Sequence, residues 1–145
     1  VLFRSMPEQL RRTVHLTTPP GDVNTVHDFL AELWPEAHGV SDVDRISVET
    51  ALIELAANVM QHADTDGAGL ACEFTIVVTD EAIDMTVRDT GEPGEIQLVG
   101  AEMPELDAES GRGLALITAL VDHVAYSQEG GHNIWRLTRA RTTGA

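Results

Sequence analysis

Apolar and polar residues alternate along several short stretches of the chain, and a period of two is the pattern of a β-strand that buries one face. The alternation is clear at residues 13–17, and again at 72–78 and 83–87. A short acidic turn separates the last two stretches, so we expect them to form a hairpin. Two further strands are expected at residues 124–127 and 134–139, on either side of a Glu-Gly-Gly turn.

The alternation also predicts which side chains of the hairpin share its buried face. They are Cys72, Phe74, Ile76 and Val78 in the first strand, and Ile83, Met85 and Val87 in the second. Asp89 continues the parity of the second strand. Its carboxylate is therefore expected to point toward the core, where an unpaired charge is costly.

Two segments carry the apolar spacing of helices. Asp22 is expected to cap the first helix, which ends at Trp34. The second helix runs from Ser41 to about His62 and begins with an approximate capping box of Ser41 and Asp44. Its apolar positions include Val43, Ile46, Ile53, Ala57 and Met60.

Residues 91–110 are rich in Gly, Pro and acidic residues and show little periodicity. We expect a loop of about 20 residues there, and loops of this length in a compact domain are usually functional or mobile. A third helix is expected at residues 113–121. The resulting order of elements predicts an α+β fold, a two-layer sandwich whose mostly antiparallel mixed sheet carries the helices on one face.

The length of 145 residues fits a single domain. We expect residues 1–12 to be a flexible N-terminus, in which the residues before Met6 are an expression remnant or a misread start. The domain itself is expected at 13–140, followed by a short tail at 141–145. The chain has no apolar stretch of about 18 residues, so no membrane span is expected.

The charge and the cysteine content narrow the classes of function. A net charge of −15 argues against nucleic acid and anionic membranes as partners, because both recruit clustered Lys and Arg. An acidic surface suits a basic protein partner, but it also serves solubility alone. Cys72 is the single cysteine, which excludes a disulfide within the monomer and a cysteine-based zinc site. We expect a reducing, cytoplasmic location and a buried, unreactive Cys72.

Glu54, Asn58 and His62 are spaced by four residues and therefore lie on one face of the second helix. A polar row on a mostly buried helix is costly unless something satisfies it. The row is either a solvated stripe or part of a site. A zinc site is disfavoured, because Asn is a poor zinc ligand and no HExxH pattern is present.

Two glycine-containing segments complete the candidate chemistry. Asp89, Thr90 and Gly91 end a strand, where Asp89 can accept from an exocyclic amine such as N6 of adenine and Gly91 allows close approach. The alternative is an ordinary turn. Residues 110–114, Ser-Gly-Arg-Gly-Leu, lead into the third helix, whose exposed N–H groups favour an anion. The alternative there is a plain hinge.

Taken in this order, the three segments resemble the N, G1 and G2 boxes of the GHKL ATPases, which have the Bergerat ATP-binding fold. The resemblance covers roughly residues 41–139. Within the superfamily, the small size, the single domain and the run at 110–114 resemble the anti-sigma factor serine/threonine kinases of the RsbW and SpoIIAB type.

The resemblance implies ATP and Mg²⁺ as ligands and assigns roles along the site. Glu54 would be the general base, Asn58 the Mg²⁺ ligand, and His62 a phosphate contact. Asp89 would accept from adenine beside Gly91, and residues 92–109 would form the lid. The remaining implied nucleotide contacts are Gly111, Arg112, Gly113 and Leu114.

The chain departs from the family pattern at two places. Pro93 stands where many relatives have a glycine, which stiffens the lid hinge. The run Gly131-His132-Asn133-Ile134 stands where many relatives have Gly-Thr-Thr, which puts in doubt the water-mediated contact that a threonine makes to the base.

The function implied by the resemblance is phosphorylation of a STAS-domain anti-sigma factor antagonist, together with binding of a sigma factor and formation of a homodimer. One alternative is a non-catalytic ATP-binding module that captures a protein partner, and another is a plain ATPase. The retained Glu54 favours transfer, because a pure sensor needs no base.

Overall fold

The computed structural model describes residues 9–62, 69–90 and 108–142 of the chain. The first half comprises β1 (Leu10–Thr18), α1 (Val23–Leu33), a short 3-10 turn (Trp34–Glu36) and α2 (Asp42–His62). The second half comprises β2 (Leu70–Val78), β3 (Ala82–Asp89), α3 (Ala108–Leu120), β4 (His123–Glu129) and β5 (His132–Ala140).

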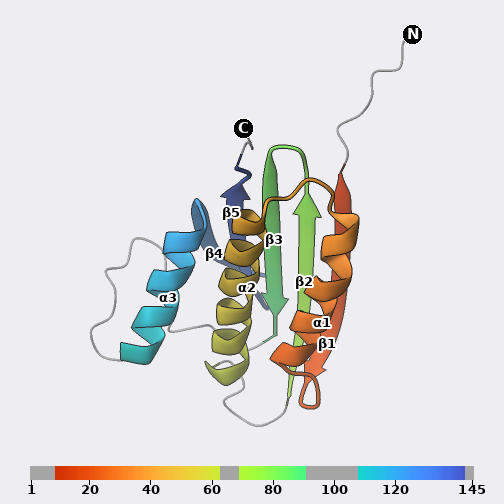
Figure 1. Cartoon of the computed structure of the whole chain (residues 1–145). Helices are drawn as coiled ribbons and strands as arrows, with labels where there is room; N and C mark the ends of the chain where they lie inside the picture. The colour runs from red at the N-terminus through yellow and green to blue at the C-terminus, as the bar shows by residue number, and fades with distance from the viewer. Residues whose placement is uncertain (1–8, 63–68, 91–107, 143–145) are drawn as a thin grey trace.

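The five strands form one open sheet in the order β1-β2-β3-β5-β4. Each neighbouring pair of strands is antiparallel. The three helices pack side by side on one face of the sheet, with α2 between α1 and α3 (Figure 1). The predicted α+β sandwich is confirmed. Because β5 pairs with β3, the end of the chain lies beside the hairpin of β2 and β3.

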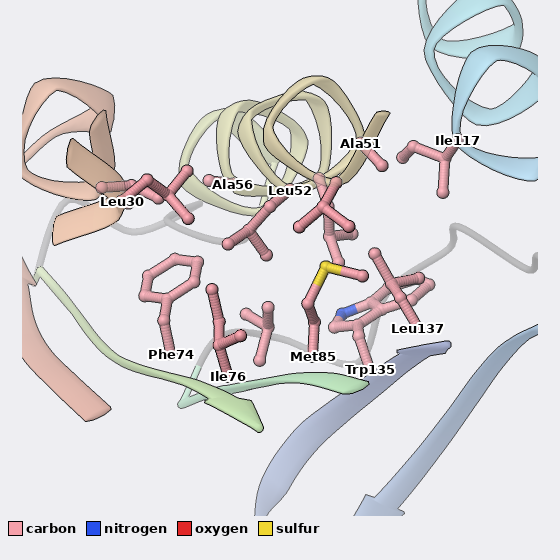
Figure 2. Packing of buried hydrophobic residues seen from close by; sticks show 14 of the residues in the cluster. Leu30, Ala51, Leu52, Ala56, Phe74, Ile76, Met85, Ile117, Trp135 and Leu137 are labelled. Atoms are coloured by element: carbon pink, nitrogen blue, oxygen red, sulfur yellow. The ribbon is translucent and has the colours of Figure 1, made fainter. Parts of the chain in front are cut away.

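The core lies between the sheet and the helix layer. Phe74, Ile76 and Met85 rise from the sheet toward Leu30 and Leu52 of the helices (Figure 2). The burial pattern of β2 and β3 alternates as the sequence predicts, so the assignment of their inward face is confirmed. Asp89 is part of this inward row and is 1% exposed.

Local signals determine where α1 and α2 begin. The Asp22 carboxylate accepts from the backbone N–H of Asn24 at 2.9 Å, which confirms the predicted cap of α1. The Ser41 hydroxyl accepts from the N–H of Asp44 at 3.1 Å at the start of α2. Although α2 has 21 residues, no helix in the described part of the chain is long and apolar enough to cross a membrane.

The apolar positions picked out of the α2 sequence lie mainly on the face turned away from the sheet. Val43 and Ile46 are 61% and 56% exposed. The apolar residues that α2 buries are Val48, Ala51, Leu52, Leu55, Ala56 and Val59. The helix is therefore apolar on both faces, and a helix of this kind usually has both faces covered.

Two predicted element boundaries are wrong by three residues or more. Helix α3 begins at Ala108, five residues before the predicted start at Gly113, so the Gly-rich run lies inside the helix. Gly has the lowest helix propensity after Pro, which is why the helix was expected to begin only at Gly113. Strand β1 begins at Leu10, three residues before the predicted start.

A buried carboxylate joins the start of α2 to the end of the chain. Asp44 is fully buried and accepts from Arg139 Nε at 2.9 Å. It also accepts from the backbone N–H of Thr142 at 2.7 Å and from the Thr142 hydroxyl at 2.8 Å. Arg139 in turn donates to the carbonyl of Leu120 at 2.7 Å, so this cluster connects α2, α3 and β5.

Candidate functional site

The three candidate segments come together at one end of the molecule. The C-terminal half of α2, the end of β3 and the first half of α3 all lie at the lower end of Figure 1. The sheet places β3 under α2, and the packing of α3 against α2 adds the third side. Consecutive segments are at least 19 positions apart in the sequence, since β3 ends at Asp89 and α3 begins at Ala108, so only the fold brings them together.

Gly113 allows α3 to approach the polar row of α2 closely. A Cβ atom at this position would lie 3.2 Å from Nδ2 of Asn58 and 3.3 Å from Oε2 of Glu54. Contacts this short are rare for real Cβ atoms, so the absence of a side chain determines the spacing of the two helices. The structure therefore places Glu54, Asn58 and Gly113 in direct contact.

The amide of Asn58 contains a buried donor that the described residues do not satisfy. The residue is 9% exposed, and its Nδ2 has no hydrogen-bond partner within residues 9–62, 69–90 and 108–142. Leaving such a group unpaired costs about 1–3 kcal/mol. An amide offers a donor to an anionic oxygen and a carbonyl oxygen to a cation, so a Mg²⁺–phosphate group fits it.

Glu54 is half-buried, and one of its carboxylate oxygens lies next to Gly113. It forms no ion pair with any residue that the structure describes. An unpaired carboxylate beside an unsatisfied amide is free to take a proton from a bound hydroxyl or water.

Asp89 is the last residue of β3 and lies buried on the sheet side of the candidate site. Asn133 of β5 lies directly opposite it in the ladder, and its Nδ2 donates to Asp89 Oδ1 at 2.9 Å. The next residue, Thr90, stays attached to β2, since its N–H donates to the carbonyl of Ala71 and its hydroxyl accepts from the Ala71 N–H, both at 3.2 Å. The end of β3 is therefore held in place from both sides.

Asn133 is a residue of the candidate site that sequence reasoning missed. The run around it was noted only as a departure from relatives, whereas the structure places its amide on the buried carboxylate. Tyr126 donates to Asn133 Oδ1 at 2.5 Å, and Gln128 Nε2 donates to the Tyr126 hydroxyl at 3.0 Å. Because Tyr126 occupies the amide oxygen, the amide nitrogen must face Asp89. The signal that could have identified it is the presence of a polar residue, Asn133, within a strand that is otherwise partly buried and that pairs with β3.

The charge of Asp89 affects the ionisation of Cys72 on the neighbouring strand β2. Cys72 lies opposite Asp89 in the β2–β3 ladder. Burial, assisted by the charge of Asp89, raises the pKa of the Cys72 thiol to about 12. The thiol is 4% exposed, so the expectation of a buried strand cysteine is confirmed.

The other predicted site residues are placed less fully. Gly91 and most of the expected lid at 92–109 lie outside the described residues. His62 and Arg112 lie in α2 and α3, but their side chains are outside what the structure describes. Gly111 lies in the first turn of α3, and Leu114 is 3% exposed within the hydrophobic core.

These groups suit a nucleotide polyphosphate with a hard cation. Within the described residues, no group of three or more His, Cys, Asp or Glu side chains could hold a metal ion by itself. Asn58 alone would make a weak protein site, so a Mg²⁺ ion held there would need further oxygen ligands from phosphates, as is usual for this ion.

Comparison with known proteins agrees with this interpretation. A sequence model described as the histidine kinase-like ATPase domain matches residues 16–139, which is most of the chain. A comparison with curated proteins returns no match.

Two solved structures share the fold. The RsbU and RsbW domains of Rv1364c from Mycobacterium tuberculosis superpose with a TM-score of 0.59 at 19% identity, covering 92% of this chain and 34% of that one. The histidine kinase domain of the blue-light activated histidine kinase from Erythrobacter litoralis gives a TM-score of 0.55 at 15% identity, covering 81% of this chain and 58% of that one. The chain thus spans about a third of the Rv1364c chain and somewhat over half of the chain of the Erythrobacter litoralis kinase domain.

Proposed function

The chain belongs to the family of histidine kinase-like ATPase domains, and on this premise we propose that it is a Mg-ATP-dependent protein serine/threonine kinase of the anti-sigma factor type. The observation that carries the proposal is the contact of Glu54 and Asn58 with Gly113, together with the unsatisfied Nδ2 of Asn58. In this proposal the Glu54 carboxylate is the base, and the Asn58 amide nitrogen beside it is a hydrogen-bond donor for a phosphate oxygen.

The nucleotide would bind across the three segments. Asp89, held by Asn133, would accept from the exocyclic amine of adenine, and guanine would be rejected because it presents a carbonyl oxygen there. Asn58 would hold the Mg²⁺ ion together with phosphate oxygens, and the ion would neutralise charge on the phosphates. Gly111, Gly113 and Arg112 would contact the phosphates, with Leu114 supporting them from the core and His62 as a further contact.

The transfer step needs only positioning and one base. The oxygen of a serine or threonine hydroxyl would attack the γ-phosphorus, the bond between that phosphorus and the bridging oxygen would break, and ADP would leave. Glu54 would take the hydroxyl proton. The half-buried carboxylate next to Gly113 supports this role.

The protein partners belong to the same proposal. The acceptor would be a STAS-domain anti-sigma factor antagonist, and the kinase would also sequester a sigma factor, acting as a homodimer. A chain that contains an RsbW domain and a histidine kinase domain both share this fold, so the choice of the anti-sigma type rests on the Ser-Gly-Arg-Gly-Leu run at residues 110–114. The net charge of −15 is compatible with basic protein partners.

Calorimetric titration with ATP tests the nucleotide site. We expect binding that Mg²⁺ strengthens, that GTP does not reproduce, and that Asp89→Asn loses. Glu32→Asn is the matched control, because Glu32 is an exposed carboxylate on α1. The absence of ATP binding at millimolar concentration would refute the proposal.

A transfer assay with labelled ATP and purified STAS-domain antagonists tests the chemistry. Glu54→Gln should bind ATP as the wild type does but lose transfer by a factor of about 100 or more. Binding of ATP without transfer to any antagonist would favour the non-catalytic capture module. Phosphate release without a phosphoprotein would favour a plain ATPase.

A further inference from the structure

A shallow groove crosses the outer face of α2, next to α1. Its lining residues are His27, Ile46, Glu49, Thr50, Ile53 and Glu54. We call it the α2 groove. Its volume is about 310 Å³, at the low end of the range for binding pockets and sufficient for a few side chains.

The lining of the groove combines two isoleucines, Ile46 and Ile53, with two carboxylates, those of Glu49 and Glu54. Ile46 is 56% exposed, and Val43 beside it on the same helix face is 61% exposed. Glu49 and Glu54 supply the carboxylates, and neither forms an ion pair with a residue that the structure describes. An exposed apolar stripe flanked by unpaired charges of one sign has the composition of a recognition surface.

Glu54 belongs to both the groove and the candidate phosphate site. It lines the groove on one side, and its Oε2 lies next to Gly113 on the other. A general base must reach the acceptor hydroxyl while that hydroxyl faces the phosphoryl donor. With the phosphate site on the α3 side of Glu54, the approach for the hydroxyl that the described residues leave open is the α2 groove.

We propose that the α2 groove is the docking site for the acceptor segment of the phosphorylated protein. The segment carries apolar side chains for Ile46 and Ile53, an Arg or Lys for Glu49, and the serine or threonine whose hydroxyl reaches Glu54. This inference rests on the proposed kinase function and deepens it. The favoured occupant of this face is a basic segment rather than a second copy of this chain, because in a symmetric contact the carboxylates of Glu49 and Glu54 would face the same carboxylates of the other copy.

Binding of synthetic peptides tests the docking surface separately from catalysis. The probes are two fluorescein-labelled amphipathic peptides with a central serine and identical leucines, one with Arg and the other with Glu at the polar positions. We expect the basic peptide to bind at least about tenfold more tightly at moderate salt. Equal affinity for the two peptides, or no binding of either at millimolar concentration, would overturn the proposal.

Two variants locate the binding on the groove. Glu49→Arg should reverse the preference between the peptides, and Ile46→Gln should weaken the basic peptide about tenfold without changing the charge. Leu116→Gln is the matched control, since Leu116 is an exposed apolar residue on α3 outside the groove. Thermal unfolding checks that each variant is folded. An equal loss in Leu116→Gln would show that the effect does not come from the groove.

Transfer of labelled phosphate to the basic peptide separates the two proposals. Groove-dependent binding without transfer upholds the docking site and counts against the kinase. Transfer that Ile46→Gln and Glu49→Arg leave unchanged upholds the kinase and overturns the docking site. Analytical sedimentation tests whether a second copy of this chain occupies the groove instead. Self-association that Ile46→Gln abolishes would make the groove an interface between copies and would overturn the inference.

Discussion

The amide of Asn133 holds the carboxylate of Asp89 by a hydrogen bond of 2.9 Å, across two strands that are antiparallel neighbours. Asp89 is 1% exposed, so this donor offsets part of the cost of burying its charge. Tyr126 fixes the direction of the amide by donating to its oxygen. The orientation of the Asp89 carboxylate is therefore fixed by its neighbours in the sheet.

Removing the amide should affect both stability and nucleotide binding. Asn133→Leu keeps the size of the side chain but leaves Asp89 without this donor, so we expect a loss of about 1–3 kcal/mol in the free energy of unfolding. ATP affinity should fall as well, because the carboxylate is no longer oriented. Urea unfolding and calorimetric titration measure the two effects.

The control for this variant lies in the same pair of strands. Thr138 donates to Asp84 at 2.8 Å in the β3–β5 ladder, away from the site. Thr138→Val should lower stability modestly and leave ATP affinity unchanged. If Asn133→Leu changed ATP affinity no more than Thr138→Val does, Asn133 would have only a structural role.

Gly113→Ala should separate stability from activity. Alanine favours a helix interior over glycine by about 1 kcal/mol, so the melting temperature should stay close to that of the wild type or rise. The added methyl group would lie 3.2 Å from Asn58 Nδ2 and 3.3 Å from Glu54 Oε2, which displaces both groups. We expect Mg-ATP affinity and phosphoryl transfer to fall by a factor of about ten or more.

Thr118→Ala is the matched control for this glycine substitution. Thr118 lies on the exposed side of the same helix, so alanine there raises helix propensity without contact with the site. It should leave binding and transfer intact. Full activity of Gly113→Ala would mean that the close approach of α3 to α2 has no part in the chemistry.

The buried Asp44 cluster predicts a dependence of stability on pH. Burial by itself would raise the pKa of Asp44, but hydrogen bonds from Thr142, Arg139 and Ser41 outweigh it and lower the pKa below the ordinary value of 3.8. A carboxyl with a lowered pKa contributes stability that is complete above about pH 4 and is lost as the pH falls through its folded pKa. Urea unfolding between pH 7 and pH 2 measures this loss.

Two variants identify the source of that dependence. Asp44→Asn should lose stability at pH 7 and should lack the part of the acid transition that Asp44 contributes. Arg139→Met leaves the Asp44 charge buried without its cation, so we expect a loss of about 3 kcal/mol or more at pH 7. An Asp44→Asn variant with the acid profile of the wild type would contradict the assignment.

Cys72 should be inert to thiol reagents in the folded protein. With its pKa raised to about 12, its thiolate fraction at pH 8 is about three orders of magnitude below that of an exposed thiol. Reaction with a disulfide reagent should be complete only in denaturant. Asp89→Asn removes one cause of the raised pKa and should increase the rate, whereas Asp84→Asn on the same strand should not. Fast labelling of the native wild type would contradict the prediction.

The positions of β2, β3, α1 and α2 follow from the sequence, because each is encoded by local signals. Alternation places Phe74 and Met85 on the buried face, and Asp22 caps α1 by a bond to a residue two positions away. The spacing of Glu54 and Asn58 places them on one face of α2 irrespective of the rest of the molecule.

The start of α3 and the partner of Asp89 depend on tertiary structure. A helix that contains Gly113 has low intrinsic propensity, so its stability comes from packing against α2, which no local pattern records. Asn133 meets Asp89 only because β5 inserts between β3 and β4 in the sheet, across 44 positions of sequence.

The sequence by itself therefore determined the order of the elements, the buried faces of β2 and β3, and the presence of Glu54, Asn58 and Asp89 in the candidate site. The tertiary structure decided which of those groups meet, namely Glu54 and Asn58 with Gly113, and Asp89 with Asn133. It also left the apolar outer face of α2 uncovered beside Glu54 within the described residues. The physical reason is that periodicity and capping act over a few residues, whereas strand order and helix packing depend on surfaces far apart in the chain.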